Sequence, residues 1–217
     1  MPKSSERSNR VKPRLRGVSH EIAFVAAVAL GVALIEHADG ARPRVAATVF
    51  AVSVATMFGA SALYHRVNWS PGPRRWMRRV DHAMIYALIA GTYTPFGLLV
   101  LHGSWRIVVL AVVWAGAAAA VVLKIAWIDA PKWLAAVIGI SLGWVGVIVA
   151  PQLFGRIGAS GLVLLLAGGI AYTTGAVVYA VRRPDPVPAV FGYHEVFHAL
   201  VIAAVGLQYA VVAFYVL

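Results

Sequence analysis

Residues 105–124, WRIVVLAVVWAGAAAAVVLK, carry charge only near their two ends, at Arg106 and Lys124. About 20 apolar residues in a helix cross the hydrocarbon core of a bilayer, so this stretch predicts a transmembrane helix. Short connections with Gly or Pro separate it from six other apolar stretches, at 18–37, 45–66, 80–101, 132–150, 158–181 and 193–216. We therefore expect an all-α integral membrane protein, a bundle of seven transmembrane helices. Residues 1–17 are expected to form a basic cytoplasmic tail, and residues 18–217 a single transmembrane domain.

The composition agrees with a membrane protein and excludes an ordinary soluble domain. Of the 217 residues, 61% are apolar and only 12% are charged, whereas about 25% are charged in a typical soluble protein. The mean hydropathy is +0.80. The chain has no cysteine, which excludes disulfides and thiolate metal sites.

The distribution of Lys and Arg predicts the orientation. If the N-terminus is cytoplasmic, 15 of the 19 basic residues fall in cytoplasmic segments, and the remaining four are Arg42, Arg44, Arg106 and Arg156. Cytoplasmic loops are enriched in basic residues, so we expect a cytoplasmic N-terminus and a C-terminus outside. This asymmetry explains the net charge of +11 without a nucleic acid. The expected partners of the basic face are anionic lipid headgroups of the inner leaflet.

With this topology, several polar residues reach the same depth, near the cytoplasmic surface. His65 ends the second expected helix, Asp81 opens the third, and His194 and His198 open the seventh. Ser61 precedes His65 by four residues, and His194 precedes His198 by four, so each pair lies on one helix face. Because ionisable groups are costly in a membrane, they are normally paired, ligated or functional.

Three histidines with a carboxylate are typical of a zinc site. His194 and His198 can bind one ion from a single helix face, His65 can complete a three-histidine set, and the fourth position stays open to water. Asp81 is then expected to hydrogen-bond that water and to accept its proton. His82 lies about 100° away from Asp81 around the helix and is expected to have a structural or supporting role. Snorkelling or hydrogen bonding explains the other histidines without a metal, namely His20, His37 and His102.

The segment from His194 to His198, HEVFH, also matches the HExxH motif of zinc proteases, in which Glu195 would be the general base. A protease of this kind would need a carboxylate ligand from another helix, a role that Asp81 could take. The third histidine at the right depth, His65, fits a three-histidine site better. An intramembrane metalloprotease is therefore the less favoured alternative.

Three sequence blocks, the second in two parts, resemble in order and spacing the signature of the hemolysin III family, the bacterial branch of the progestin and adipoQ receptor superfamily. They are SALYH at 61–65, DHAMIY at 81–86, AGTYTP at 90–95 and HEVFH at 194–198. The resemblance implies zinc bound by His65, His194 and His198, with Asp81 on the bound water and Ser61 nearby. It also implies seven helices and an outside C-terminus. Residues 13–17, PRLRG, depart from the family, since many members have an acidic residue and an asparagine there.

The same superfamily includes alkaline ceramidases and adiponectin receptors, which hydrolyse lipid amides. The resemblance therefore implies a zinc-dependent hydrolase of a lipid amide or ester at the inner leaflet of the bacterial plasma membrane. Asp81 and Ser61 are its expected catalytic residues, with Ser61 orienting the substrate oxygen. One alternative is a cytolytic protein, as the family name says, although the helix centres have few polar residues to line a pore. Another is a lipid sensor with a structural zinc.

Overall fold

The computed structural model describes residues 13–217, so residues 1–12 of the expected basic tail lie outside the described residues. The described chain is almost entirely helical, as the sequence predicts. Its long helices are α1 (Val18–His37), α2 (Ala41–Arg66), α3 (Pro71–Leu99), α4 (Gly103–Ala126), α5 (Lys132–Gly143), α6 (Ala150–Val181) and α7 (Tyr193–Val211). A short 3₁₀-helix (η1, Val145–Val149) follows α5, and a π-helical turn (η2, Val212–Val216) follows α7.

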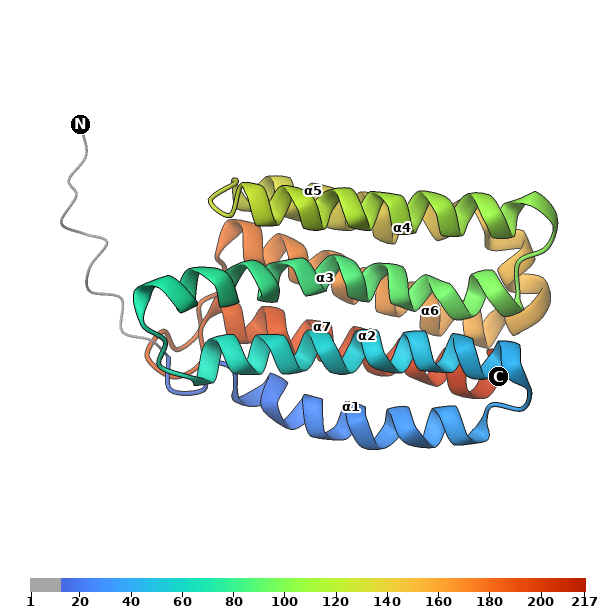
Figure 1. The fold of residues 1–217 in the computed structure, drawn as a ribbon, viewed down its shortest axis with the longest axis horizontal. Helices are drawn as coiled ribbons and strands as arrows, with labels where there is room; N and C mark the ends of the chain where they lie inside the picture. Colours follow the sequence, from blue (N-terminus) through green and yellow to red (C-terminus); the bar gives the residue numbers. More distant parts are fainter. Residues whose placement is uncertain (1–12) are drawn as a thin grey trace.

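The helices run alternately up and down along one common direction (Figure 1). Polar contacts between segments distant in sequence show which helix ends lie together. Arg66 at the end of α2 bonds to Glu21 at the start of α1. Lys132 at the start of α5 donates to the hydroxyl of Tyr193 at the start of α7, at 3.1 Å. Arg16, just before α1, bonds to Glu195 at the start of α7. The start of α1 thus shares one end of the bundle with the end of α2 and the starts of α5 and α7.

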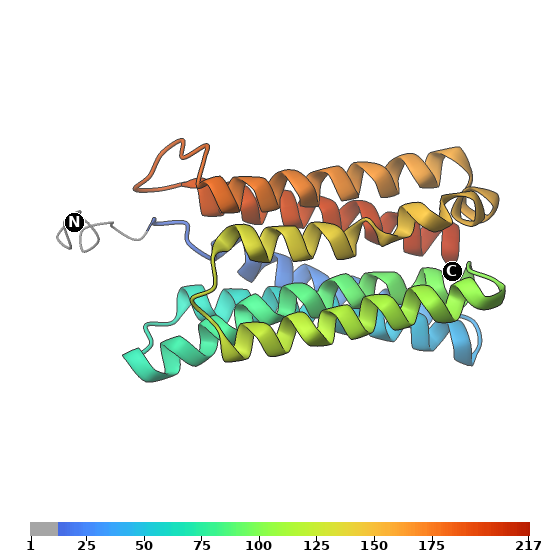
Figure 2. The ribbon, with the colours of Figure 1, turned by 90° about the horizontal axis from the view of Figure 1, so that it is seen from above.

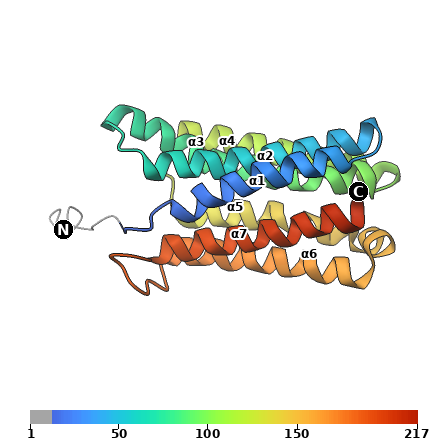
Figure 3. The same cartoon turned by 90° about the horizontal axis from the view of Figure 1, so that it is seen from below.

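Neighbours in sequence are mostly neighbours in space. The most extensive packing is between α1 and α2, α2 and α3, α3 and α4, and α6 and α7. Seen from above and from below, α6 and α7 lie side by side on one side of the bundle, α1 to α4 lie on the other, and α5 lies between them (Figures 2 and 3). Small residues permit close approach, because a side chain on Gly31 of α1 would meet Ala51 of α2.

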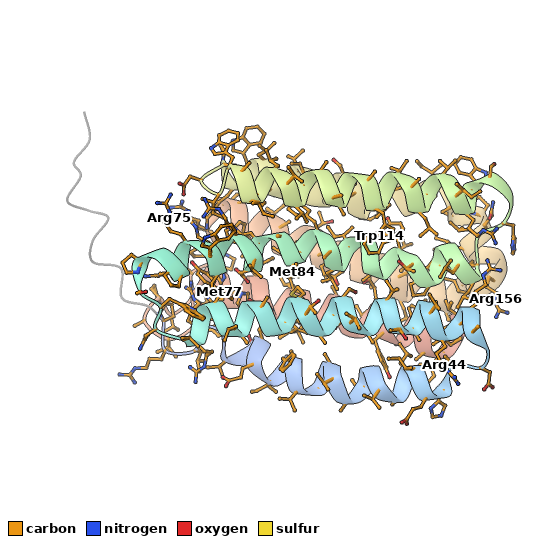
Figure 4. All side chains as sticks on the ribbon, in the orientation of Figure 1. Arg44, Arg75, Met77, Met84, Trp114 and Arg156 are labelled. Carbon is orange, nitrogen blue, oxygen red and sulfur yellow. The ribbon has the colours of Figure 1, made fainter. Side chains whose placement is uncertain are left out.

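The outer surface of the bundle is suited to lipid. Many large apolar side chains point outward, including Ile107 of α4 and Val163 of α6, which are 66% and 64% exposed. Within residues 13–217, five segments are long and apolar enough to cross a membrane: α1, α2, α4, the α5–α6 segment (Lys132–Val181) and the last segment, Tyr193–Val216. Figure 4 shows Arg75 at one end of the bundle and Arg44 and Arg156 at the other. The chain is a multi-pass membrane protein.

Three helix boundaries differ from the sequence expectation. The third helix begins at Pro71 rather than near residue 80, because proline is well suited to the first turn of a helix and the basic residues after it favour helix. The expected span 132–150 ends its α-helix at Gly143 and continues as η1. The Tyr93 hydroxyl stabilises this break by donating to the Gly143 carbonyl and accepting from the Gly146 amide, at 2.6 and 2.8 Å. The sixth helix begins at Ala150 and is kinked at Gly158, which has a φ of 64°.

A candidate metal centre

Three buried histidines converge at the end of the bundle where α1, α5 and α7 begin. His65 lies in the last turn of α2, and His194 and His198 lie in the first two turns of α7. One ligand atom from each lies within 4.8 Å of the other two. The Nε2 atoms of His65 and His194 are 3.1 Å apart. All three residues are at most 7% exposed, so this trio can hold a metal ion in a buried site.

Hydrogen bonds at the start of α7 fix where the helix that carries two of the histidines begins. The helix begins directly after Gly192, whose amide donates to Oε2 of Glu195 at 2.9 Å in a capping arrangement. The other carboxylate oxygen of Glu195 accepts from the guanidinium of Arg16. Glu195 is 2% exposed and does not line the cavity described below. Its carboxylate is therefore occupied in joining the segment before α1 to the start of α7.

Asp81 and Ser61 lie beside the histidines. Asp81, in α3, is 8% exposed, and its Oδ2 is 3.9 Å from Nε2 of His65. The Ser61 hydroxyl, one turn before His65 on α2, is placed to donate a hydrogen bond to Asp81. His82 has its Nε2 3.9 Å from the same Asp81 oxygen. The carboxylate is thus positioned between the histidine trio and His82.

The sequence left His20 unassigned, but the structure places this residue against the trio. Its ring is stacked on that of His198, with centroids 3.7 Å apart and planes 9° from parallel. His20 is 2% exposed, and neither ring nitrogen makes a hydrogen bond of good geometry. The position of His20 at the start of the first apolar stretch, the same depth as the other three, is the signal that could have included it.

The backbone before α1 also touches the site. Gly17 has a φ of 83°, and a Cβ atom added to it would lie 2.6 Å from Cβ of His65. A glycine is therefore required here both by the left-handed backbone and by the lack of space. The PRLRG segment contributes to the site through Arg16 and Gly17, contacts that pattern reading from the sequence did not find.

A cavity of about 140 Å³ opens beside the trio. At one end it is lined by polar side chains, among them Ser61, Asp81 and His198, and along the rest mainly by apolar side chains of α3, α5 and α6. A second cavity of about 320 Å³ shares Tyr93, Trp144 and other lining residues with the first. The polar centre therefore opens onto a mainly apolar cavity, and a second apolar cavity lies on the other side of the shared residues.

The loop beyond this end of the bundle carries an exposed ion pair. Asp129, between α4 and α5, accepts a hydrogen bond from the guanidinium of Arg78 in α3. This hydrogen bond and the positive charge of Arg78 lower the pKa of Asp129 below its ordinary value. Asp129 is thereby engaged with Arg78 and remains ionised at neutral pH.

Comparison with known proteins places this geometry in context. Residues 8–209 match the family described as Haemolysin-III related. The chain is similar to a protein named Hemolysin-3 from Bacillus cereus, at 31% identity over 203 residues, covering 92% of this chain and 90% of the relative. It is also similar to a Hemolysin-3 homolog from Bacillus subtilis (strain 168), at 30% identity over 168 residues, covering 77% and 76%.

Proposed function

The chain belongs to the Haemolysin-III related family, and from this premise we propose that it is a zinc-dependent hydrolase of a lipid amide or ester, acting at the inner leaflet. The observation that carries the proposal is the trio of buried histidines, whose ligand atoms lie within 4.8 Å of one another. A carboxylate, a hydroxyl and an apolar cavity lie directly beside this trio. A purely structural metal would not need this access to a cavity.

The donor set fits zinc. Zinc bound to imidazole nitrogens at about 2.0–2.1 Å in a tetrahedral site separates those nitrogens by about 3.4 Å, and the observed 3.1 Å between His65 and His194 is close to this value. His198 has a buried ring nitrogen, Nδ1, without a hydrogen bond. Three histidines leave one coordination position open, as in catalytic zinc sites. When bound there, zinc would polarise a substrate carbonyl and make a water molecule more acidic.

Asp81 is the proposed general base. It accepts a proton from the attacking water, whose oxygen forms a bond to the carbonyl carbon of the lipid. The carbon–nitrogen or carbon–oxygen bond then breaks, and Asp81 returns the proton to the leaving amine or alcohol. The products are a fatty acid and that amine or alcohol. The burial of Asp81 and the 3.9 Å between its Oδ2 and Nε2 of His65 support its role as the general base.

Ser61 is the proposed second catalytic residue. From one turn deeper than His65, its hydroxyl can stabilise or orient the carbonyl oxygen of the substrate. Its position, from which it can donate to Asp81, supports a second contribution, which is to fix the orientation of the carboxylate. Both functions require the hydroxyl to face the cavity, which Ser61 lines.

The proposal includes the topology of seven crossings, with the N-terminus in the cytoplasm. It is supported by the alternation of α1 to α7 and by Arg75, which lies at the same end as the histidine trio, whereas Arg44 and Arg156 lie at the opposite end (Figure 4). In this topology the metal centre lies in the inner leaflet, so the expected partners are membrane lipid as substrate and anionic headgroups around the basic face.

A lipid-release assay tests the proposal. Purified protein in nanodiscs is incubated with lipid amides and esters, and fatty acid release is measured by mass spectrometry. Zinc-loaded wild type is expected to release fatty acid, and Asp81→Asn to keep the zinc but lose about 10²-fold or more of the rate. His194→Ala is expected to lose both. If zinc-loaded wild type hydrolyses none of these lipids, the proposed hydrolase activity is refuted.

The names of the relatives favour one alternative, a cytolytic protein. The cavity beside the histidines is mainly apolar, which suits an acyl chain better than a conducting path. A haemolysis assay with wild type and Asp81→Asn separates the two functions. Lysis by both proteins, without lipid turnover, would favour cytolysis.

Glu195 is bonded to Arg16 and Gly192, which weighs against its acting as the base of a metalloprotease.

A further inference from the structure

A lysine lies inside the bundle, where a lysine is costly. Lys124, near the end of α4, is only 4% exposed. It lines the same cavity as Asp81, Ser61 and His198. Lysines near the ends of membrane helices normally extend to the headgroups and keep the amine in water. Lys124 instead contributes its side chain to the wall of a mainly apolar cavity.

Lys124 has no counter-ion in the described part of the chain. The ion pairs there involve Arg16, Arg66, Arg78 and two histidines, and Lys124 makes no hydrogen bond. Asp129, in the loop that follows α4, is bonded to Arg78. A buried amine without a partner is unfavourable in a membrane bundle. The partial negative charge at the C-terminal end of α4 favours a cation near that terminus. It does not explain why the side chain of Lys124 faces the cavity.

The neighbouring lysine differs in this respect. Lys132 has its Nζ 4.0 Å from the centroid of the Tyr179 ring and donates to the hydroxyl of Tyr193 at 3.1 Å. Aromatic faces and a hydroxyl therefore satisfy its amine. Among the residues that line the cavity, Lys124 is the basic side chain that stays available to a ligand.

The rest of the cavity indicates what else the ligand must contain. Beyond Lys124 the walls are mainly apolar, and a second apolar cavity adjoins the first at Tyr93 and Trp144. We propose that the cavity selects a single-chain amphiphile with an anionic headgroup, a carboxylate or a phosphate, which Lys124 binds as its counter-ion while the acyl chain extends along the apolar space. This proposal names the substrate class of the hydrolysis proposed above and rests on it.

Binding of ligands that cannot be hydrolysed tests this proposal separately from turnover. Dissociation constants are measured by fluorescence in nanodiscs of neutral phosphatidylcholine. The ligands are monohexadecyl phosphate, hexadecanoate, the neutral ether 1-O-hexadecylglycerol and inorganic phosphate alone. Wild type is expected to bind the two anionic amphiphiles at least tenfold more tightly than the ether. Much weaker binding of inorganic phosphate than of the anionic amphiphiles would show that the apolar chain is part of the recognised ligand. Equal binding of the two would overturn the proposal that the ligand is an amphiphile.

Variants identify the lysine as the cause. Lys124→Gln is expected to weaken binding of the anionic amphiphiles at least tenfold, because a charge-assisted contact is lost, and to leave binding of the ether unchanged. Lys124→Arg should keep most of the preference for anions. The matched control Arg75→Gln removes a positive charge at the same end of the bundle, outside the cavity, and should change neither. Equal losses in Lys124→Gln and Arg75→Gln, or no loss in either, would overturn the proposal.

Stability provides a readout that does not depend on any ligand. Lys124→Met keeps a long side chain without the charge, so the ligand-free variant should have a raised Tm, because an uncompensated buried charge is removed. A lowered Tm would show that Lys124 serves the fold and would overturn the proposal.

If wild type hydrolyses no lipid but binds anions through Lys124, the proposed hydrolase fails while the anion site stands. Turnover with no preference for anions refutes the site alone.

Discussion

Gly17 connects the segment before α1 to the candidate metal centre, and replacing it with alanine tests that connection. An alanine at a φ of 83° is strained by about 1–2 kcal/mol, because its Cβ approaches a backbone carbonyl. The added Cβ would also lie 2.6 Å from Cβ of His65, whereas non-bonded carbons pack at about 3.5–4.0 Å. Either the backbone or His65 must therefore move by about 1 Å.

A shift of that size matters for a metal ligand, since metal–ligand distances are held to about 0.2 Å. We expect Gly17→Ala to weaken zinc binding about 10–100-fold, the range seen when residues that support a ligand are changed. The assay is competition with a chelator of known affinity on detergent-purified protein. Thermal unfolding of the metal-free protein should also show a loss of stability of about 1–2 kcal/mol or more.

Gly40→Ala is the matched control. Gly40 also precedes a helix with a positive φ, of 92°, but an added Cβ would meet nothing closer than Cδ of Pro43 at 3.9 Å. Its backbone strain is at least as large as that of Gly17→Ala, and it lies at the opposite end of the bundle. This variant should lose stability and keep the affinity for zinc. Equal zinc affinities of the two variants would refute the idea that Gly17 positions His65.

Three further outcomes follow, two from contacts in the structure and one from the proposed topology. Glu195→Gln should lower stability by about 2 kcal/mol and leave the zinc content unchanged, because the lost contact is the one with Arg16; retained stability with lost zinc or activity would contradict this. Tyr93→Phe should cost about 1–3 kcal/mol in thermal unfolding, since it leaves two backbone groups at the α5–η1 break without partners. An unchanged Tm would exclude that role. The chain has no cysteine, so Arg75→Cys and Arg156→Cys introduce single labelling sites. A membrane-impermeant maleimide applied to intact cells should label only the latter, and the reverse pattern would invert the topology.

The helical fold could be predicted from the sequence because lipid imposes strong constraints. A spanning segment must satisfy its own backbone hydrogen bonds and expose apolar side chains, so hydropathy alone locates most of the helices. The start of α3 was predicted too late because hydropathy detects the membrane boundary, whereas the helix continues into the basic segment beyond it. The break after Gly143 was missed because it depends on the Tyr93 hydroxyl, which is distant in sequence.

The histidine trio was found from spacing and depth, and its convergence required only that α2 and α7 lie near each other at one end. Other parts of the site depend on contacts that spacing does not encode. His20 stacks on His198 from α1, and Gly17 approaches His65. Glu195 fits a catalytic motif in sequence, but its carboxylate bonds to Arg16. These contacts follow from the packing of α1 against α2 and α7, which no local pattern specifies.

Metal content is the most direct test of a metal centre built from the histidine trio. Protein purified in detergent without chelators is analysed by elemental mass spectrometry, with Glu195→Gln as a control beside His65→Ala and His194→Ala. We expect about one zinc per chain in the wild type and in Glu195→Gln, and loss of this zinc in both histidine variants. Wild type without metal, or histidine variants that retain it, would contradict a metal centre built from this trio.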